Sequence, residues 1–213
     1  MKKLFKFGMV MLLAISLVGC GGDNDSKDKK DDLLSGNHHA VIDVKDYGVI
    51  KVELNADEAP ITVTNFVKLA KDGFYDGLTF HRIINGFMIQ GGDPEGNGTG
   101  GSDETIKGEF SANGVDNVLK HTRGAISMAR SQDYDSASSQ FFIMHETNDS
   151  LDGQYAVFGY VYEGMDVVDK IATSVPVTDN NGTVEAQNQP VINSIKITAV
   201  SYTHLTLPTN SLV

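Results

Sequence analysis

The chain has no tryptophan, a single cysteine and far fewer basic than acidic residues. One cysteine excludes an internal disulfide, so the fold must be held by its hydrophobic core. With 17 basic and 28 acidic residues, the net charge is -11. No basic surface of that composition would neutralise a phosphate backbone, so nucleic acid is not an expected partner. We interpret the acidity as favouring solubility.

The N-terminus combines a basic start, "MKKLFKFG", with a short apolar run, "MVMLLAISLV", that is too short to be a comfortable membrane span. This pattern is typical of a secretory signal. The run ends in "LVGC" at Cys20 and resembles a bacterial lipobox, where signal peptidase II cuts before a cysteine whose sulfur carries diacylglycerol. We therefore expect a signal peptide over residues 1–19 and a lipid on Cys20. The protein would then be anchored to the cell membrane on its extracytoplasmic side. The alternative is an ordinary signal peptide with an incidental cysteine.

Two further segments lack the patterns of a folded domain. Residues 20–39 are polar and Gly-rich, which indicates a lipidated cysteine followed by a flexible linker. The last thirteen residues, 201–213, show neither alternation nor helical spacing and are expected to form a disordered tail. The domain itself is expected over residues 40–200.

Short β-rich runs dominate that domain. Two of them flank the turn at Asp46–Gly48, which indicates a hairpin. A helix is predicted over 59–73, with Pro60 in its first turn and Gly73 at its C-terminal cap. A second helix fits residues 164–173. Further strands are predicted over 78–84, 87–90, 124–129, 140–145, 156–161 and 191–200. Because two helices do not cover both faces of a sheet, we expect a mainly β fold: a closed antiparallel barrel with helices at its ends.

Several motifs suggest chemistry that their context does not support. "GNGTGG", residues 96–101, matches a dinucleotide-binding fingerprint, but no apolar helix pattern follows it. Residues 93–104 have the spacing of a calcium loop, with Glu95 at a position that prefers Asp or Asn and no flanking helices. A glycine-rich surface loop is the better interpretation, and weak calcium binding stays open. The histidines have no zinc-ligand spacing, and Ser127 and Ser139 lack a nucleophile-elbow sequence. We expect no metal site and no cofactor.

The stretch "FHRIINGFMIQGGD", residues 80–93, sets His81, Arg82 and Gln90 among apolar residues and contains no nucleophile. A reaction that breaks no σ bond needs none. Rotation about an X-Pro peptide bond is such a reaction, and it is slow because the amide nitrogen shares its lone pair with the carbonyl. Twisting returns the lone pair to the prolyl nitrogen. A fixed arginine can then donate to it near the transition state only.

The sequence also resembles one family closely. "FHRIINGFMIQGGD", "GNGTGG", "LKHTRGAISMAR", "SSQFFI" and "LDGQYAVFG" occur in the order found in cyclophilins, the cyclosporin-binding prolyl isomerases. The resemblance covers about Ala40 to Val200 and implies an eight-stranded antiparallel barrel capped by two helices. It implies a peptidyl-prolyl cis-trans isomerase that acts on proline-containing polypeptides and assists folding of secreted or cell-envelope proteins. We expect a monomer.

By position, the resemblance also implies site residues. Arg82 matches the catalytic arginine, with His81 beside it and Gln90 as the group that holds the peptide backbone. The proline pocket and the peptide groove correspond to Phe87, Met88, Phe142, Leu151, Tyr155, Ala129 and Arg130. His81 has a second interpretation, a buried histidine satisfied by backbone, which stays open.

The chain departs from the better-known eukaryotic pattern at Asn85, Ser150 and Tyr155, where those members have proline, tryptophan and histidine. A tyrosine keeps a ring and a polar tip, so activity is expected to survive. Ser150 removes a large drug-contacting surface, so cyclosporin binding is expected to be weak. Two other functions remain open: a non-catalytic binding module that uses the same groove, and a calcium-dependent adhesion lipoprotein built around residues 93–104.

Overall fold

The computed structural model describes residues 33–198, so the predicted signal peptide, Cys20 and the tail at 201–213 lie outside the described residues. The described chain forms one eight-stranded antiparallel sheet, in the order β3-β4-β6-β5-β7-β2-β1-β8. The strands are β1 (Asn37–Val44), β2 (Gly48–Asn55), β3 (Thr79–Ile84), β4 (Met88–Asp93), β5 (Ala125–Met128), β6 (Phe141–Met144), β7 (Val157–Glu163) and β8 (Ile192–Thr198). The helices are α1 (Pro60–Lys71) and α2 (Met165–Ser174), with single 3₁₀ turns η2 (Ser111–Asn113), η3 (Asp149–Leu151) and η4 (Ala186–Asn188).

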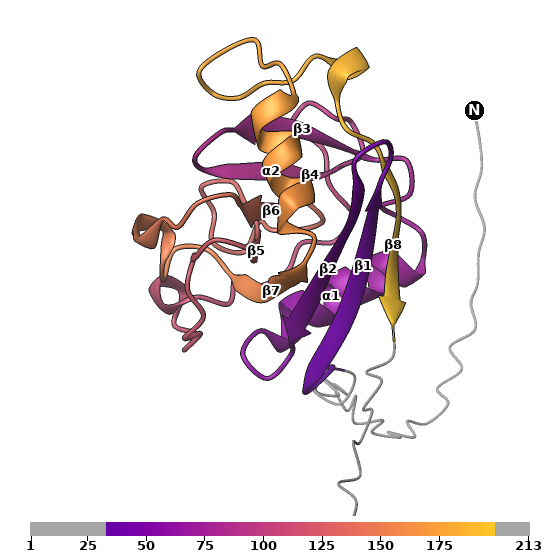
Figure 1. Cartoon of the computed structure of the whole chain (residues 1–213). Coiled ribbons are helices and arrows are strands. Elements are labelled where there is room, and N and C mark those ends of the chain that lie inside the picture. The colour runs from indigo at the N-terminus through magenta and orange to yellow at the C-terminus, as the bar shows by residue number, and fades with distance from the viewer. Residues whose placement is uncertain (1–32, 199–213) are drawn as a thin grey trace, which may run out of the picture. The chain divides into compact units, whose positions relative to one another are not determined.

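The prediction of a closed barrel is wrong, because the sheet curls into a half-barrel whose two edge strands, β3 and β8, share no ladder (Figure 1). The irregular segment that precedes β8 covers the edge of β3 instead. Ile83 N–H donates to the Gly182 carbonyl at 2.8 Å, and Phe80 N–H donates to the Pro190 carbonyl at 2.9 Å. Proline has no N–H to return a ladder bond. The edge is therefore satisfied by loop backbone, and closure by strand pairing is not needed.

The predicted β-hairpin and the predicted ends of helix α1 are confirmed. β1 and β2 form the expected hairpin, with Asp46 in the left-handed region at φ 66°. Helix α1 begins at Pro60, and Gly73, at φ 72°, follows its end. β1 begins at Asn37, so the last residues of the segment predicted as linker lie in the sheet. Among residues 33–198, no helix has the length and apolar character needed to cross a bilayer.

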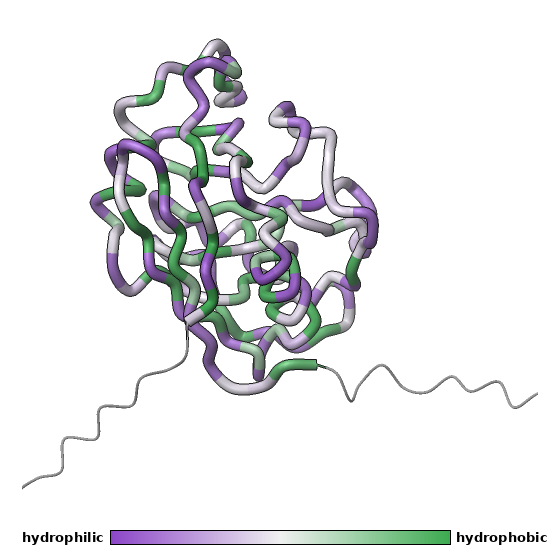
Figure 2. The backbone as a smooth tube through the Cα atoms, turned by 90° about the vertical axis from the view of Figure 1, so that its right-hand side faces the viewer, coloured by the Kyte–Doolittle hydropathy of each residue, from purple (hydrophilic) through white to green (hydrophobic). Residues whose placement is uncertain are grey.

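The core lies between the inner face of the sheet and the two helices. Helix α1 packs against β2 and β8, whereas α2 packs against β2, β3 and β4. Apolar and polar stretches alternate along the chain, as expected for strands with one buried face (Figure 2). The rings of Phe66, Tyr75, Phe141 and Phe158 meet at centroid distances of 5.2–5.6 Å in the centre of this core. Their burial supplies much of the driving force for folding.

A buried carboxylate from a distant loop caps helix α1. The residue before the helix, Ala59, offers no side-chain oxygen to its free N–H groups. Glu109, 2 % exposed, accepts instead from the backbone N–H groups of Ile61 at 2.9 Å and Thr62 at 2.8 Å. The Thr62 hydroxyl also donates to it at 2.7 Å. A carboxylate at this end of a helix satisfies orphan donors and interacts favourably with the helix dipole.

Replacing Glu109 by Ala should therefore destabilise the domain by about 2–3 kcal/mol, because it leaves buried N–H groups without acceptors. For a domain of this size, that corresponds to a melting temperature lower by roughly 5–10 °C. Glu104→Ala, at an exposed position in the same region, serves as the matched control and should change stability little. Equal melting temperatures for the two variants would show that Glu109 does not hold α1 in place.

Candidate active site

A row of directly paired residues crosses four neighbouring strands on the outer face of the sheet. Arg82 of β3 pairs with Gln90 of β4, and Gln90 pairs in turn with Phe142 of β6. Phe142 pairs with Ser127 of β5. Directly opposed residues of antiparallel strands project to the same face, a few ångströms apart. The sheet register therefore places a cation, an amide and an aromatic ring side by side.

A β-bulge in β3 aims two consecutive side chains at this face. Phe80 pairs with Gly91 and Arg82 pairs with the adjacent Gln90, so β3 carries one extra residue, His81. Phe80 and Ile83 both lie in the core, at 0 % and 1 % exposed. Strict alternation would have sent one of these two outward. The bulge instead leaves both His81 and Arg82 facing the outer pocket.

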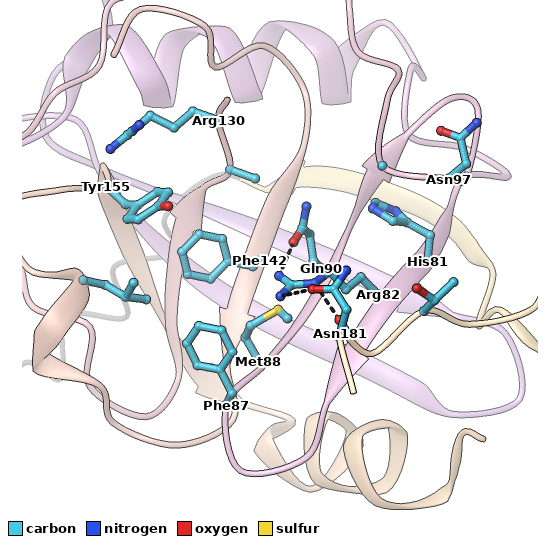
Figure 3. Close-up of a pocket in the computed structure, with 15 residues that line it drawn as sticks. His81, Arg82, Phe87, Met88, Gln90, Asn97, Arg130, Phe142, Tyr155 and Asn181 are labelled. Carbon is cyan, nitrogen blue, oxygen red and sulfur yellow. Dashed lines mark hydrogen bonds between the residues drawn. The ribbon is translucent and has the colours of Figure 1, made fainter. Parts of the chain in front are cut away.

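This face holds a pocket of about 470 Å³ (Figure 3). All ten side chains predicted for the site line it: His81, Arg82, Phe87, Met88, Gln90, Ala129, Arg130, Phe142, Leu151 and Tyr155. The structure adds residues from two loops that the sequence did not assign to the site: Gly96, Asn97, Gly98, Asn181 and Thr183. Residues predicted from four separate motifs thus come together in one concave site of the size that small ligands and peptide side chains occupy.

Arg82 is held in place by three hydrogen bonds. Its Nε donates to the backbone carbonyl of Asn181 at 2.8 Å, and its Nη2 donates to Asn181 Oδ1 at 3.2 Å. Its Nη1 donates to Gln90 Oε1 at 3.1 Å, as the dashed lines of Figure 3 show. Gln90 is oriented by Gln140, whose Oε1 accepts from Gln90 Nε2 at 2.9 Å. Gln140 itself donates to the Gly100 carbonyl at 2.8 Å. The guanidinium plane is thus fixed before any substrate arrives.

The neighbouring side chains Arg82 and His81 differ in charge. Burial lowers the pKa of Arg82, partly opposed by Tyr155 and Asp179, but an arginine remains a cation under all physiological conditions. Burial also lowers the pKa of His81, against the attraction of Asp93 and with the repulsion of Arg82. His81 is only 4 % exposed, and neither ring nitrogen has a hydrogen-bond partner among the described residues. The site therefore presents one fixed cation beside a neutral imidazole.

The other end of the pocket is apolar. Met88 and Phe142 are 1 % and 5 % exposed, and together with Phe87 and Leu151 they form a second hydrophobic cluster, separate from the main core. The ring of Tyr155 meets that of Phe142 nearly at right angles, with centroids 6.0 Å apart. An apolar recess of this kind suits a saturated ring, and it lies directly beside Arg82.

A buried polar chain supports Phe142 from behind. The His121 ring lies almost parallel to that of Phe142, with centroids 6.0 Å apart. His121 Nδ1 lies 3.0 Å from Asp152 Oδ1, and Nε2 lies 3.1 Å from Ser127 Oγ. Burial lowers the pKa of His121 despite Asp152. Although this order of groups resembles a hydrolase triad, Ser127 is 0 % exposed and no substrate can reach it. These hydrogen-bonded side chains hold His121 against the ring of Phe142.

Arg130 contributes less to the pocket than its charge suggests. Its guanidinium carbon lies 4.6 Å from the centroid of the Tyr155 ring and 4.8 Å from that of Tyr134. Its Nε and Nη2 both donate to the Gln154 carbonyl. Figure 3 shows the head of Arg130 pointing away from Arg82. Arg130 therefore steadies the tyrosine wall through cation–π contacts, and leaves Ala129 beside the open groove.

Sequence reasoning missed Asn181 and Gln140, the residues that orient Arg82 and Gln90. Asn181 lies in "DNNGT", which signals only a turn, and nothing in its local sequence points to β3. Gln140 stands in the quoted motif "SSQFFI" and is the first residue of the strand predicted over 140–145, so its position was a usable signal. Ser150 is exposed and donates to Asn148 Oδ1 through both its N–H and its hydroxyl. The expectation of weak cyclosporin binding stays a prediction.

The glycine-rich loop is organised by its own carboxylate. Asp93, 1 % exposed, accepts from the backbone N–H groups of Glu95, Asn97 and Gly98 at 2.6–3.0 Å. Burial raises the pKa of Asp93, but these hydrogen bonds outweigh it and the net shift is downward. Within residues 33–198, no group of three or more acidic, histidine or cysteine side chains is placed to hold a metal ion. The calcium interpretation therefore gains no support from this part of the chain.

Comparison with known proteins identifies the family of this chain. Residues 39–201 match the family model of the cyclophilin type peptidyl-prolyl cis-trans isomerases. The chain is 50% identical over 123 residues to peptidyl-prolyl cis-trans isomerase B of Bacillus subtilis. That match covers 58% of this chain and 82% of that protein. It is 46% identical over 144 residues to a peptidyl-prolyl cis-trans isomerase of Helicobacter pylori, which covers 67% of this chain and 85% of that protein.

A solved structure agrees with these relatives. A cyclophilin type peptidyl-prolyl cis-trans isomerase of Cryptosporidium parvum, crystallised in the presence of the dipeptide Ala-Pro, superposes with a TM-score of 0.67. The sequences are 31% identical, and the match covers 76% of this chain and 99% of that one. Since the family model spans most of the chain and the site residues converge as the motifs predict, this chain belongs to the cyclophilin-type peptidyl-prolyl cis-trans isomerase family.

Proposed function

We propose that this isomerase assists the folding of secreted or cell-envelope polypeptides while anchored by lipid at Cys20 to the extracytoplasmic face of the cell membrane. The support is the lipobox-like "LVGC" after a signal-like start, followed by a polar, Gly-rich segment that leads to the catalytic domain. X-Pro isomerisation takes tens to hundreds of seconds when uncatalysed, slow enough to limit the folding of newly exported chains.

The observation that carries the catalytic proposal is a fixed guanidinium at the edge of an apolar recess. The proline ring of the substrate would enter the recess formed by Phe87, Met88 and Phe142, with Leu151 and Tyr155 at its rim. Gln90, already oriented by Gln140, would hold the peptide backbone. Ala129 lies where the groove opens, and its N–H donates within the protein to the Gln140 carbonyl at 3.0 Å. Its carbonyl is therefore the group we assign to the substrate peptide.

Catalysis would then arise from a bond that exists only near the transition state. In the planar amide the prolyl nitrogen has no lone pair to offer. As the bond twists, this nitrogen becomes an acceptor and Arg82 donates to it. Since Asn181 and Gln90 hold the guanidinium beforehand, little reorganisation is needed at that moment. Binding that strengthens selectively in the transition state lowers the barrier.

His81 has a supporting place in this proposal. Its neutral ring lines the pocket next to Arg82, and its two nitrogens lack partners among the described residues. Both nitrogens are buried, so the ring offers no hydrogen bond at the pocket surface. We therefore propose that His81 shapes the Arg82 end of the pocket as a neutral ring, beside the bulge that places both residues there.

Replacing Arg82 by Ala should lower kcat/KM by at least about 10- to 150-fold, because a hydrogen bond from a charged donor contributes roughly 1.5–3 kcal/mol. Arg82→Lys should restore activity only in part, since an ammonium keeps the charge but lacks the fork held by Asn181. A proline-peptide isomerisation assay gives the rates, and calorimetry with the same peptide should show a much smaller change in affinity.

The matched control is Lys196→Ala, which removes one positive charge from an exposed position on β8. Circular dichroism and the melting temperature separate catalysis from folding. A folded and fully active Arg82→Ala protein would exclude the catalytic assignment. Peptide binding by a wild-type protein that does not accelerate isomerisation would favour the non-catalytic binding module instead.

Replacing Cys20 by Ala should abolish lipid attachment and signal peptidase II processing, because the sulfur is the acceptor for the lipid. Labelled fatty acid fed to the expressing bacterium measures lipid attachment, and the mass of the chain shows whether residues 1–19 have been removed. Ser26→Ala, in the polar segment that follows, is the matched control and should be labelled as the wild type is. Fatty acid incorporated into the Cys20→Ala protein would rule out the anchor.

A further inference from the structure

Phe87 of the proline pocket lies in a short, exposed turn. Residues 85–87 connect β3 to β4, and Phe87 N–H donates to the Ile84 carbonyl at 3.0 Å. Asn85 and Gly86 are exposed, and Gly86 is in the left-handed region at φ 79°. No core residue lies within the turn itself, so its conformation depends on what holds it from outside.

A single histidine after β6 holds this turn at two points. His145 Nδ1 accepts from the backbone N–H of Gly86 at 2.9 Å. The backbone N–H of His145 donates to the Phe87 carbonyl at 2.9 Å, and that of Glu146 donates to the same oxygen at 3.3 Å. His145 is 7 % exposed. Its ring is thus fixed against the Asn85–Gly86 peptide unit, one residue before Phe87.

Helix α2 and the loop before β5 fix the other side of the ring. His145 Nε2 lies 3.3 Å from Asp169 Oδ1, and Asp169 pairs with Arg123 at 2.8 Å. Arg123 Nη1 also donates to the His145 carbonyl at 2.7 Å. The hydrogen bond from Arg123 lowers the pKa of Asp169, which therefore faces Nε2 as a carboxylate. The contact between Nε2 and this carboxylate is electrostatic and is not a hydrogen bond, since Asp169 Oδ1 has no hydrogen-bond partner within residues 33–198. The N–H of Gly86 requires a lone pair on Nδ1, so the ring proton lies on Nε2.

We propose that His145 is a positioning residue for the proline pocket, acting through the Gly86 N–H to hold Phe87 against the substrate ring. The inference rests on the proposed catalytic site and adds a residue that none of its motifs contains. Because Asn181 and Gln90 orient Arg82 independently of this turn, loss of His145 should weaken proline binding and leave the chemical step largely intact.

Two substitutions of His145 distinguish loss of the hydrogen-bond acceptor from loss of the imidazole ring. In His145→Asn, the side-chain amide oxygen takes the place of Nδ1 and can still accept from Gly86, but it no longer reaches Asp169. In His145→Leu, the volume is largely kept and the acceptor is lost. The matched control is His39→Leu, because His39 Nε2 also lies 3.3 Å from a carboxylate, that of Glu53, on the remote β1–β2 hairpin.

Steady-state isomerisation of a proline peptide should show KM raised about five- to tenfold in His145→Leu with kcat changed less than twofold, the loss of one hydrogen bond. His145→Asn should recover most of that loss. Amide hydrogen exchange of Gly86 should be faster in His145→Leu and close to wild type in His145→Asn. His39→Leu should alter neither KM nor this exchange.

A folded His145→Leu protein with wild-type KM would overturn the inference, and so would a His145→Asn protein no better than His145→Leu. If His145→Leu does not fold, nitrogen NMR of the wild-type imidazole decides: a proton on Nδ1 contradicts the acceptor role. A wild-type protein without isomerase activity would instead contradict the catalytic proposal. An active wild type whose KM does not change when His145 is replaced would contradict only the role of His145.

Discussion

One extra residue in strand β3 determines where the catalytic groups lie. The bulge lets Phe80 and Ile83 both enter the core while His81 and Arg82 both face outward. From Arg82, the antiparallel register extends the site strand by strand to Gln90 and then Phe142. A shift of one residue in any of these ladders would turn the corresponding side chain into the core. The geometry of the pocket is therefore a consequence of backbone pairing, which the buried core makes rigid.

The rest of the molecule stabilises this row from both sides. The loop at 181–184 covers the open edge of β3 and supplies both oxygens of Asn181 to Arg82. On the opposite side, the buried His121 braces Phe142. The open edge of the half-barrel therefore contributes to the site. A strand paired with β3 would replace the loop, and Asn181 would not be there to orient the guanidinium. A reaction without a nucleophile needs this kind of fixed electrostatic environment more than it needs reactive side chains.

Sequence patterns predicted the elements and the pocket residues well because their causes are local. Pro60 and Gly73 mark the ends of α1, and the pocket residues lie in recognisable motifs. What they could not provide is long-range: whether β3 and β8 pair, and that Asn181 lies against a strand 99 residues earlier. The closed barrel was predicted from the need to protect sheet edges, a need that loop backbone meets here. The bulge at His81 likewise follows from the register of β4.

An isomerase pocket must accelerate rotation about the X-Pro bond as well as bind proline. Two-dimensional exchange NMR on a short Ala-Pro peptide, with the protein at catalytic concentration, measures cis–trans interconversion directly at equilibrium. Free X-Pro bonds exchange over tens to hundreds of seconds. If Arg82 stabilises the twisted amide, exchange cross-peaks should appear within about one second, and the cis-to-trans ratio of the free peptide should not change. Peptide signals that broaden or shift on binding, with interconversion as slow as in free solution, would contradict it.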